Sequence, residues 1–134
     1  MCQNAGMTMD VTSTSPAPVA GFIGGGFMAE VHSRASRSAR AFVHGITSSS
    51  PASAERAAAR LGLSAAYANA EQLLADESID VVHVCTPNAT HFDFALAAID
   101  AGKHVICEKP LATSSADAEK LVARARAAGV TATV

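Results

Sequence analysis

Residues 18–33 read PVAGFIGGGFMAEVHS, and this stretch decides the fold class. The apolar run PVAGFI stops at three glycines, which is typical of a buried strand that ends in a tight turn. After the glycines, Phe27, Val31 and Ala35 recur at helical spacing. The stretch therefore predicts a strand, a glycine turn and a helix in direct succession.

The glycine turn fits a dinucleotide-binding motif. Gly24, Gly26 and Ala29 occupy the three small positions of G-x-G-x-x-G/A, between a strand and a helix as that motif requires. Gly24 would allow the tight turn, and Gly26 would let the backbone approach a pyrophosphate. The N–H groups at the start of the helix, at Phe27 and Met28, would face the phosphates. The alternative is a flexible glycine turn without a ligand.

Strand and helix patterns alternate along the rest of the chain. Further strands are predicted within residues 40–47, 65–69, 80–86, 103–107 and 130–134, and helices within 51–61, 70–76, 89–102 and 115–128. The predicted helix caps are Ser50, Asn69 and Ser114 at the starts and Gly62, Gly102 and Gly129 at the ends. This alternation predicts an α/β protein with a doubly wound parallel sheet of about six strands, a Rossmann fold. We expect a flexible leader over 1–17 and one NAD(P)-binding domain over 18–134.

Composition excludes several classes of function. The chain has 134 residues, 49% hydrophobic and 16% charged, with a net charge of −2. It is long enough for one compact domain, and it has no basic surface for nucleic acid or an anionic membrane. No stretch approaches the ~20 apolar residues of a membrane span, and the first residues lack a signal-peptide pattern, so we expect a cytoplasmic protein. Cys2, Cys85 and Cys107 lack metal-ligand spacing and predict reduced, mostly buried thiols and no metal site.

The end of the second strand bears on the choice of cofactor. A dinucleotide fold often carries an acidic residue there, which binds the adenosine ribose hydroxyls. This chain has GITSSSP instead, with Ser48 at the acidic position. Serines do not repel a 2′-phosphate and can donate hydrogen bonds to one, which favours NADP slightly. The serines can equally cap the next helix, the preferred interpretation at Ser50, and the choice between NAD and NADP stays open.

Polar clusters follow the fourth and fifth strands. Residues 85–91 read CTPNATH, and residues 107–112 read CEKPLA. Ligands of open parallel sheets bind beyond the carboxyl ends of the strands, so the loops after strands one, four and five should face one crevice. Pro110 would end the fifth strand and hold Lys109 extended over that crevice. A solvated charged turn is the alternative for Glu108 and Lys109.

The stretches GFIGGGFMAEVH and VVHVCTPNATHFDFALAAIDAGKHVICEKPLA, with their spacing, resemble the N-terminal domain of the Gfo/Idh/MocA oxidoreductases. The resemblance runs from about Val19 to the last residue. It implies an NAD(P)-dependent oxidoreductase domain that transfers hydride to or from a sugar, polyol or related substrate. The family's second, α+β domain, used for substrate binding and oligomerisation, is absent from this sequence. We therefore expect a fragment, with homo-oligomers only for a full-length form; the alternative is a free-standing, non-catalytic NAD(P)-binding module, as a sensor or partner subunit.

The resemblance also implies roles for individual residues. Those placed at the cofactor are Gly24, Gly26, Phe27, Met28, Ser48, Thr86, Pro87, Asn88, His91 and Glu108. Lys109 is the substrate-facing, catalytic lysine, because an ammonium can stabilise a developing oxyanion or relay its proton. For His91, capping or packing is preferred to a direct chemical role, and the remaining histidines are interpreted as structural. Lys103 should lie at the opposite end of the fifth strand, as a control for Lys109.

Overall fold

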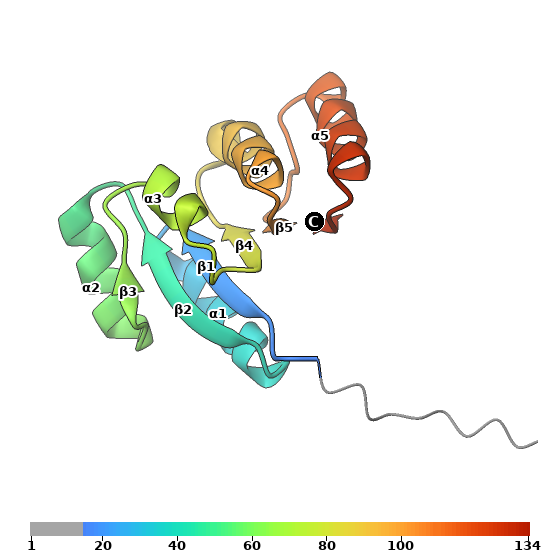
Figure 1. Cartoon of the computed structure of the whole chain (residues 1–134). Coiled ribbons are helices and arrows are strands. Elements are labelled where there is room, and N and C mark those ends of the chain that lie inside the picture. The colour runs from blue at the N-terminus through green and yellow to red at the C-terminus, as the bar shows by residue number, and fades with distance from the viewer. Residues whose placement is uncertain (1–14) are drawn as a thin grey trace, which may run out of the picture.

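The computed structural model describes residues 15–134 and shows one parallel sheet with helices on both faces (Figure 1). The strands are β1 (Val19–Ile23), β2 (Phe42–Thr47), β3 (Ala65–Ala66), β4 (Val81–Val84), β5 (His104–Cys107) and β6 (Ala132–Thr133). The helices are α1 (Phe27–Ser38), α2 (Pro51–Leu61), α3 (Ala70–Ala75), the short 3₁₀ turn η1 (Asn88–Thr90), α4 (His91–Asp100) and α5 (Ser115–Ala128). The predicted alternation of strands and helices is confirmed.

The strands follow the order β3-β2-β1-β4-β5-β6, and every pairing is parallel. The chain winds outward from β1 to β3, crosses back to β4, and then winds outward the other way. The strand order therefore reverses between β1 and β4, at the place where open α/β sheets bind their ligands. The doubly wound, six-stranded Rossmann fold predicted from the sequence is confirmed.

The core lies in two layers, one on each face of the sheet. Phe22 and Ile46 pack with Ala57 and Leu61 on the side of α1 and α2. The larger layer lies on the side of α3, α4 and α5 and comprises mainly Ile23, Leu73, Ile79, Val82, Val84, Ala95, Ile99, Val105, Cys107 and Leu121. Strands covered on both faces read as nearly continuous apolar runs, as β1 does and as β4 does apart from His83.

Helix ends follow the predicted caps, with one informative exception. The side chains of Ser50, Asn69 and Ser114 each accept a hydrogen bond from a backbone N–H in the first turn of α2, α3 and α5. Gly62 and Gly129 end α2 and α5 in the left-handed conformation that glycine adopts without strain. Helix α1 begins at Gly26, which has no side chain to cap the first turn. The N–H groups at the start of α1 are therefore open toward the carboxyl edge of the sheet.

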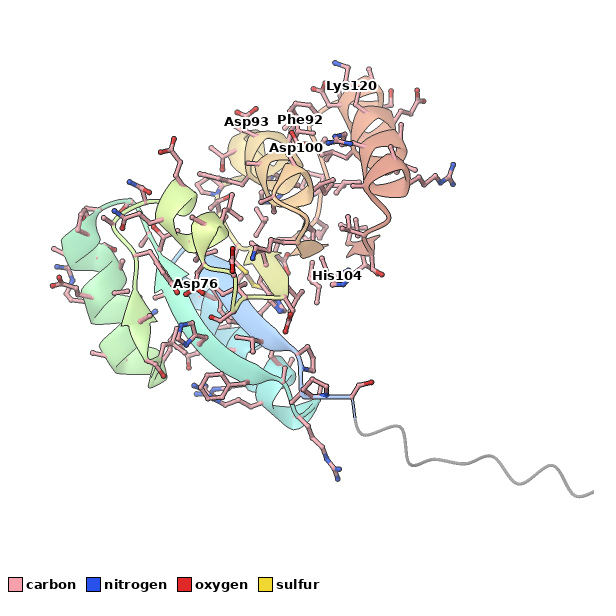
Figure 2. The ribbon with its side chains drawn as sticks, in the orientation of Figure 1. Asp76, Phe92, Asp93, Asp100, His104 and Lys120 are labelled. Atoms are coloured by element: carbon pink, nitrogen blue, oxygen red, sulfur yellow. The ribbon has the colours of Figure 1, made fainter. Side chains whose placement is uncertain are left out.

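Helices α4 and α5 pack side by side at one end of the sheet (Figure 2). The Lys120 ammonium lies 5.8 Å from the centre of the Phe92 ring, and the Arg124 guanidinium donates to Asp100 at 2.6 Å. No helix within residues 15–134 is long and apolar enough to cross a membrane. Cys85 and Cys107 are free thiols, whereas Cys2 and residues 1–14 of the predicted leader lie outside the described residues.

Candidate functional site

A cavity of about 1040 Å³ opens at the carboxyl ends of β1, β2 and β4. It lies at the reversal of strand order, where the fold predicts a ligand. Seven of the residues predicted at the cofactor line it: Gly24, Gly26, Phe27, Met28, Ser48, Thr86 and Pro87. The loops after β1 and β4 thus meet at one cavity, together with the end of β2.

The two motif glycines are needed for different reasons. Gly24 has φ +104°, and a Cβ on it would collide with the backbone carbonyl of Cys85. Its N–H donates to the Thr47 carbonyl at 2.9 Å, so Gly24 lets the ends of β1, β2 and β4 approach closely. Gly26 has φ −85°, and a Cβ on it would meet nothing within 4 Å. Gly24 is therefore required by the fold, whereas Gly26 keeps space open above the start of α1.

The chemistry of the cavity fits a dinucleotide. The uncapped start of α1 offers N–H donors and the positive end of a helix dipole to phosphate oxygens. The Thr47 hydroxyl is buried and has no hydrogen-bond partner among the described residues, although Thr47 lines the cavity. Phe27 is 76% exposed at the first position of α1, an apolar surface beside these polar groups. A group with a charged centre and flat apolar rings would satisfy all three features.

The end of β2 carries hydroxyls where an acidic residue is common. Ser48 Oγ lies 3.0 Å from Ser53 Oγ, and Ser50 caps α2 by accepting from the Ser53 N–H, the interpretation preferred from the sequence. Sequence reasoning missed Arg60, whose guanidinium donates to the Gly25 carbonyl at 2.7 Å. Arg60 therefore holds the glycine loop from α2, a contact for which the local sequence gives no signal.

His91 joins the loops that follow β4 and β5. Its side chain is fully buried, with Nδ1 2.7 Å from the Pro110 carbonyl oxygen and Nε2 2.8 Å from the Thr86 carbonyl oxygen. It does not line the cavity, and the packing role preferred from the sequence agrees with this position. His91 therefore acts on the site through the backbone of the two loops that it connects.

Glu108, in the loop after β5, forms a hydrogen bond with His32, a histidine that the sequence analysis interpreted as structural. Glu108 Oε1 is 2.7 Å from Nε2 of His32 on α1, and Nδ1 of His32 is 3.0 Å from Nδ1 of His83 on β4. Burial and the nearby Glu108 carboxylate raise the pKa of Cys85 to about 12 and that of Cys107 to about 11, so both thiols stay protonated. The Glu108 carboxylate therefore interacts with a histidine and with two thiols at the carboxyl ends of the strands.

Lys109 and Asn88 take no part in this buried network. Both are exposed at the edge of the sheet, and Lys109 makes no hydrogen bond or ion pair to any residue in 15–134. The Lys109–Pro110 peptide bond is cis. Asn88, Glu108 and Lys109 lie outside the cavity lining, in the loops beside it.

Lys103 lies just before β5, at the opposite end of the strand from Lys109, as predicted. Only 7% exposed, Lys103 donates from Nζ to the carbonyl oxygens of Asp76 at 2.7 Å and Ile79 at 2.8 Å. A buried ammonium that satisfies two carbonyl groups stabilises the fold, so Lys103 matches Lys109 in residue type but not in exposure.

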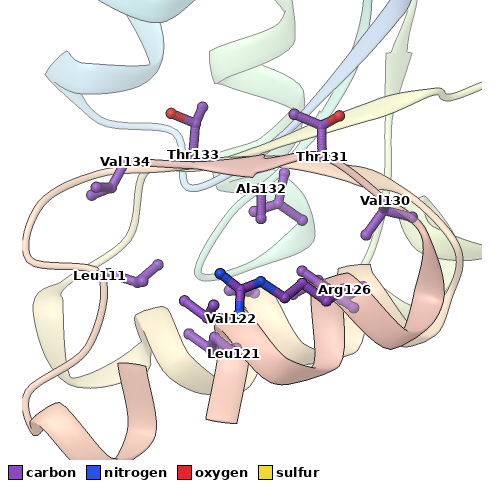
Figure 3. A pocket seen from close by; sticks show the side chains of 13 residues that line it. Leu111, Leu121, Val122, Arg126, Val130, Thr131, Ala132, Thr133 and Val134 are labelled. Carbon is purple, nitrogen blue, oxygen red and sulfur yellow. The ribbon is translucent and has the colours of Figure 1, made fainter. Parts of the chain in front are cut away.

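A second cavity, of about 530 Å³, lies between α5 and β6 (Figure 3). Its lining is mainly apolar and includes Leu111, Leu121, Val122 and Val130, with Arg126 beside them. None of the predicted site residues borders it. The predicted site residues that line a cavity therefore all line the larger one.

Comparisons with known proteins agree with this geometry. A family model described as "Oxidoreductase family, NAD-binding Rossmann fold" matches residues 19–134. A 1,5-anhydro-D-fructose reductase of Ensifer adhaerens is 48% identical over 81 residues, covering 58% of this chain and 24% of that protein. A D-xylose 1-dehydrogenase (NADP(+)) of Haloferax volcanii is 43% identical over 86 residues, covering 64% of this chain and 26% of that protein.

A solved NAD binding oxidoreductase from Klebsiella pneumoniae superimposes with a TM-score of 0.84 at 40% identity, covering 89% of this chain and 34% of that one. This chain thus spans about a quarter of the length of the curated relatives named above. The family match extends over nearly all the described residues, and it includes the glycine loop and both strand-end motifs. The resemblance seen in the sequence is confirmed: the chain belongs to the Gfo/Idh/MocA oxidoreductase family and carries that family's NAD-binding Rossmann fold.

Proposed function

We propose that the cavity between the glycine loop and the ends of β2 and β4 binds NAD(H) or NADP(H), as the cofactor half of an oxidoreductase. The observation that carries this proposal is the uncapped start of α1 beneath Gly26, where the backbone leaves open space beside free N–H donors. In this proposal the N–H groups of Phe27 and Met28 bind the pyrophosphate. Ser48 binds the adenosine ribose, and Thr86 and Pro87 form the wall opposite.

The proposed reaction oxidises a sugar or polyol hydroxyl, or reduces the matching carbonyl. Support comes from the relatives, whose names specify an anhydrofructose and a xylose as substrates. When bound, the cofactor supplies the nicotinamide that accepts or donates hydride. Lys109 Nζ is free of protein partners among residues 15–134, so its ammonium is available to stabilise charge that develops on that oxygen or to relay its proton.

Asn88 and Glu108 would act beside Lys109. The Glu108 carboxylate lies next to Lys109 in the chain, and we place it at the nicotinamide ribose. Asn88, exposed at the start of η1, would border the same end of the cofactor. His91 would fix the loops that carry Thr86 and Pro110, so its contribution is indirect.

A cytoplasmic location is part of the proposal, because Cys85 and Cys107 are free thiols, as is usual in a reducing compartment. We also propose homo-oligomers for a full-length form. A non-catalytic NAD(P)-binding module, as a sensor or partner subunit, is the second candidate. Turnover of a sugar or polyol by the chain would exclude that second candidate.

A titration of the chain with NADH and with NADPH tests the cofactor site. Gly26→Val is expected to abolish binding of both, because its side chain enters the space reserved for the pyrophosphate. The variant should keep the wild-type unfolding midpoint, since a Cβ on Gly26 meets no other atom. Gly26→Ala should weaken binding less than Gly26→Val. Unchanged affinity in both variants would refute the site, and a marked preference for NADH would refute the small preference for NADP.

A further inference from the structure

Four polar side chains from three elements form a continuous chain behind the cavity. Glu108, after β5, contacts His32 on α1 at 2.7 Å, and His32 contacts His83 on β4 at 3.0 Å. His83 Nε2 lies 3.3 Å from Ser36 Oγ, one turn along α1 from His32. The side chains of His32 and Glu108 are 15% and 20% exposed, and His83 is 5% exposed. This series of hydrogen-bonded side chains is thus largely shielded from water, most completely at His83.

One assignment of the ring tautomers satisfies every hydrogen bond along this series of side chains. The Glu108 carboxylate can only accept, so His32 donates to it from Nε2. In this assignment His32 accepts at Nδ1, and His83 donates from its own Nδ1. Burial, followed by the neighbouring His32, lowers the pKa of His83 to about 4, so His83 is neutral at pH 7. His83 Nε2 therefore accepts from the Ser36 hydroxyl, and every donor points toward Glu108.

The inner end of the chain is held rigidly. The His83 ring stacks on Phe22, with ring centres 4.6 Å apart and planes within 18°. The His32 ring meets His83 edge to face at 5.3 Å. Rings held on a strand and a helix leave Glu108 with little rotational freedom. Oε1 of Glu108 is thereby fixed, whereas Oε2 has no hydrogen bond to any described residue.

We propose that His32, supported by His83 and Ser36, is a positioning residue that fixes Glu108 so that its free oxygen accepts a hydroxyl of the nicotinamide ribose. The inference rests on the function proposed above. His32 lies on α1, the helix whose start would face the phosphates. The hydrogen bond between His32 and Glu108 therefore also links the glycine loop to the loop after β5. A ribose diol is a suitable partner, because its hydroxyl donates one strong hydrogen bond to a carboxylate oxygen.

Binding measurements on the 134-residue chain separate this role from simple packing. NADH, or NADPH if that binds more tightly, is compared with ADP, which has the phosphates but lacks the nicotinamide riboside. His32→Phe and Glu108→Gln are each expected to weaken the dinucleotide about tenfold, as for loss of one hydrogen bond to a charged group, and to change ADP affinity less than twofold. His32→Gln should restore part of the loss, because its amide can donate to Glu108. His104→Gln, on the exposed start of β5, is the control.

Nitrogen NMR of the histidine rings gives a second readout that does not depend on binding. The wild-type chain should show His32 protonated at Nε2 and His83 protonated at Nδ1, and Glu108→Gln should shift the His32 signals but not those of His104. Opposite tautomers, or equal loss of ADP and dinucleotide affinity in His32→Phe, would overturn the inference. A wild-type chain that binds neither ligand would instead refute the proposed cofactor site.

Discussion

Strand β5 is flanked by two lysines that differ in almost every physical respect. Lys103, before the strand, is 7% exposed and donates to two backbone carbonyls. Lys109, after the strand, is exposed and makes no polar contact with any residue in 15–134. At the amino end of the strand the ammonium completes the fold, whereas at the carboxyl end the ammonium is unpaired within residues 15–134.

The same contrast extends across the sheet. At the amino end, Asp76 accepts from the Ser78 hydroxyl and from Tyr67, and these hydrogen bonds hold its pKa well below the usual range. Figure 2 labels Asp76 in the loop between α3 and β4, and His104 at the start of β5. At the carboxyl end, the start of α1 lacks a side-chain cap and the Thr47 hydroxyl lacks a hydrogen-bond partner within residues 15–134. Unsatisfied groups gather where a ligand can satisfy them.

Replacing Lys109 should have the largest effect, and it should be on rate alone. In this chain fused to the second domain of a family member, Lys109→Ala is expected to lower kcat by ~10²–10⁴-fold, as for loss of a general acid/base group. NAD(P)H affinity and the unfolding midpoint should hardly change, since the Lys109 side chain has no partner to lose within residues 15–134. Steady-state kinetics with a sugar substrate provide the measurement.

The control for Lys109 must be a lysine that supports neither site nor fold. Lys120 on α5 suits this purpose, because its side chain is 67% exposed and pairs only with surface groups. Lys120→Ala should leave kcat unchanged. Equal rates for the Lys109 and Lys120 variants would remove the proposed chemical role of Lys109.

The pH dependence of unfolding offers a second way to distinguish the contributions of the carboxyl and amino ends of the sheet to stability. Burial lowers the pKa of His83 from 6.5 to about 4, so between these pH values the unfolded chain binds a proton that the folded chain does not. The free energy of unfolding should therefore fall as pH drops from about 6.5 to about 4, by up to about 3 kcal/mol. Asp76 acts in a lower window: the stability from its lowered pKa is present above about 3.8 and is lost as pH falls further.

Urea unfolding at pH 7, 5.5 and 4 measures this slope. His83→Gln should flatten the decline between pH 6.5 and 4, because the titrating ring is gone, and Asp76→Asn should leave that window unchanged. Within residues 15–134, the side chains in contact with the His83 ring include those of His32, Ser36 and Phe22. A slope that is the same in His83→Gln and in the wild type would assign the acid sensitivity elsewhere.

The sequence was sufficient to predict elements and strand ends, because those depend on local patterns. Apolar runs, caps and glycines specify each strand and helix over a few residues, and parallel topology then brings the loop ends to one edge. The contacts that differ between the two ends of β5 are not local. Glu108 and His32 are 76 positions apart, and Lys103 and Ile79 are 24 apart. Such pairs depend on strand register and helix rotation, which periodicity does not specify.

Replacing Lys103 should give the smallest of these effects, and it should be on stability alone. Lys103→Met keeps the buried apolar stem but removes the ammonium that satisfies the Asp76 and Ile79 carbonyls, so the free energy of unfolding should fall by roughly 2 kcal/mol. The matched variant Lys120→Met should change it by less than about 0.5 kcal/mol. Because Lys103 lies at the far end of β5 from the cavity, NAD(P)H affinity should stay within twofold, as measured by titration of the folded variant. A loss of cofactor affinity with unchanged stability would show that the two ends of the strand are not functionally separate.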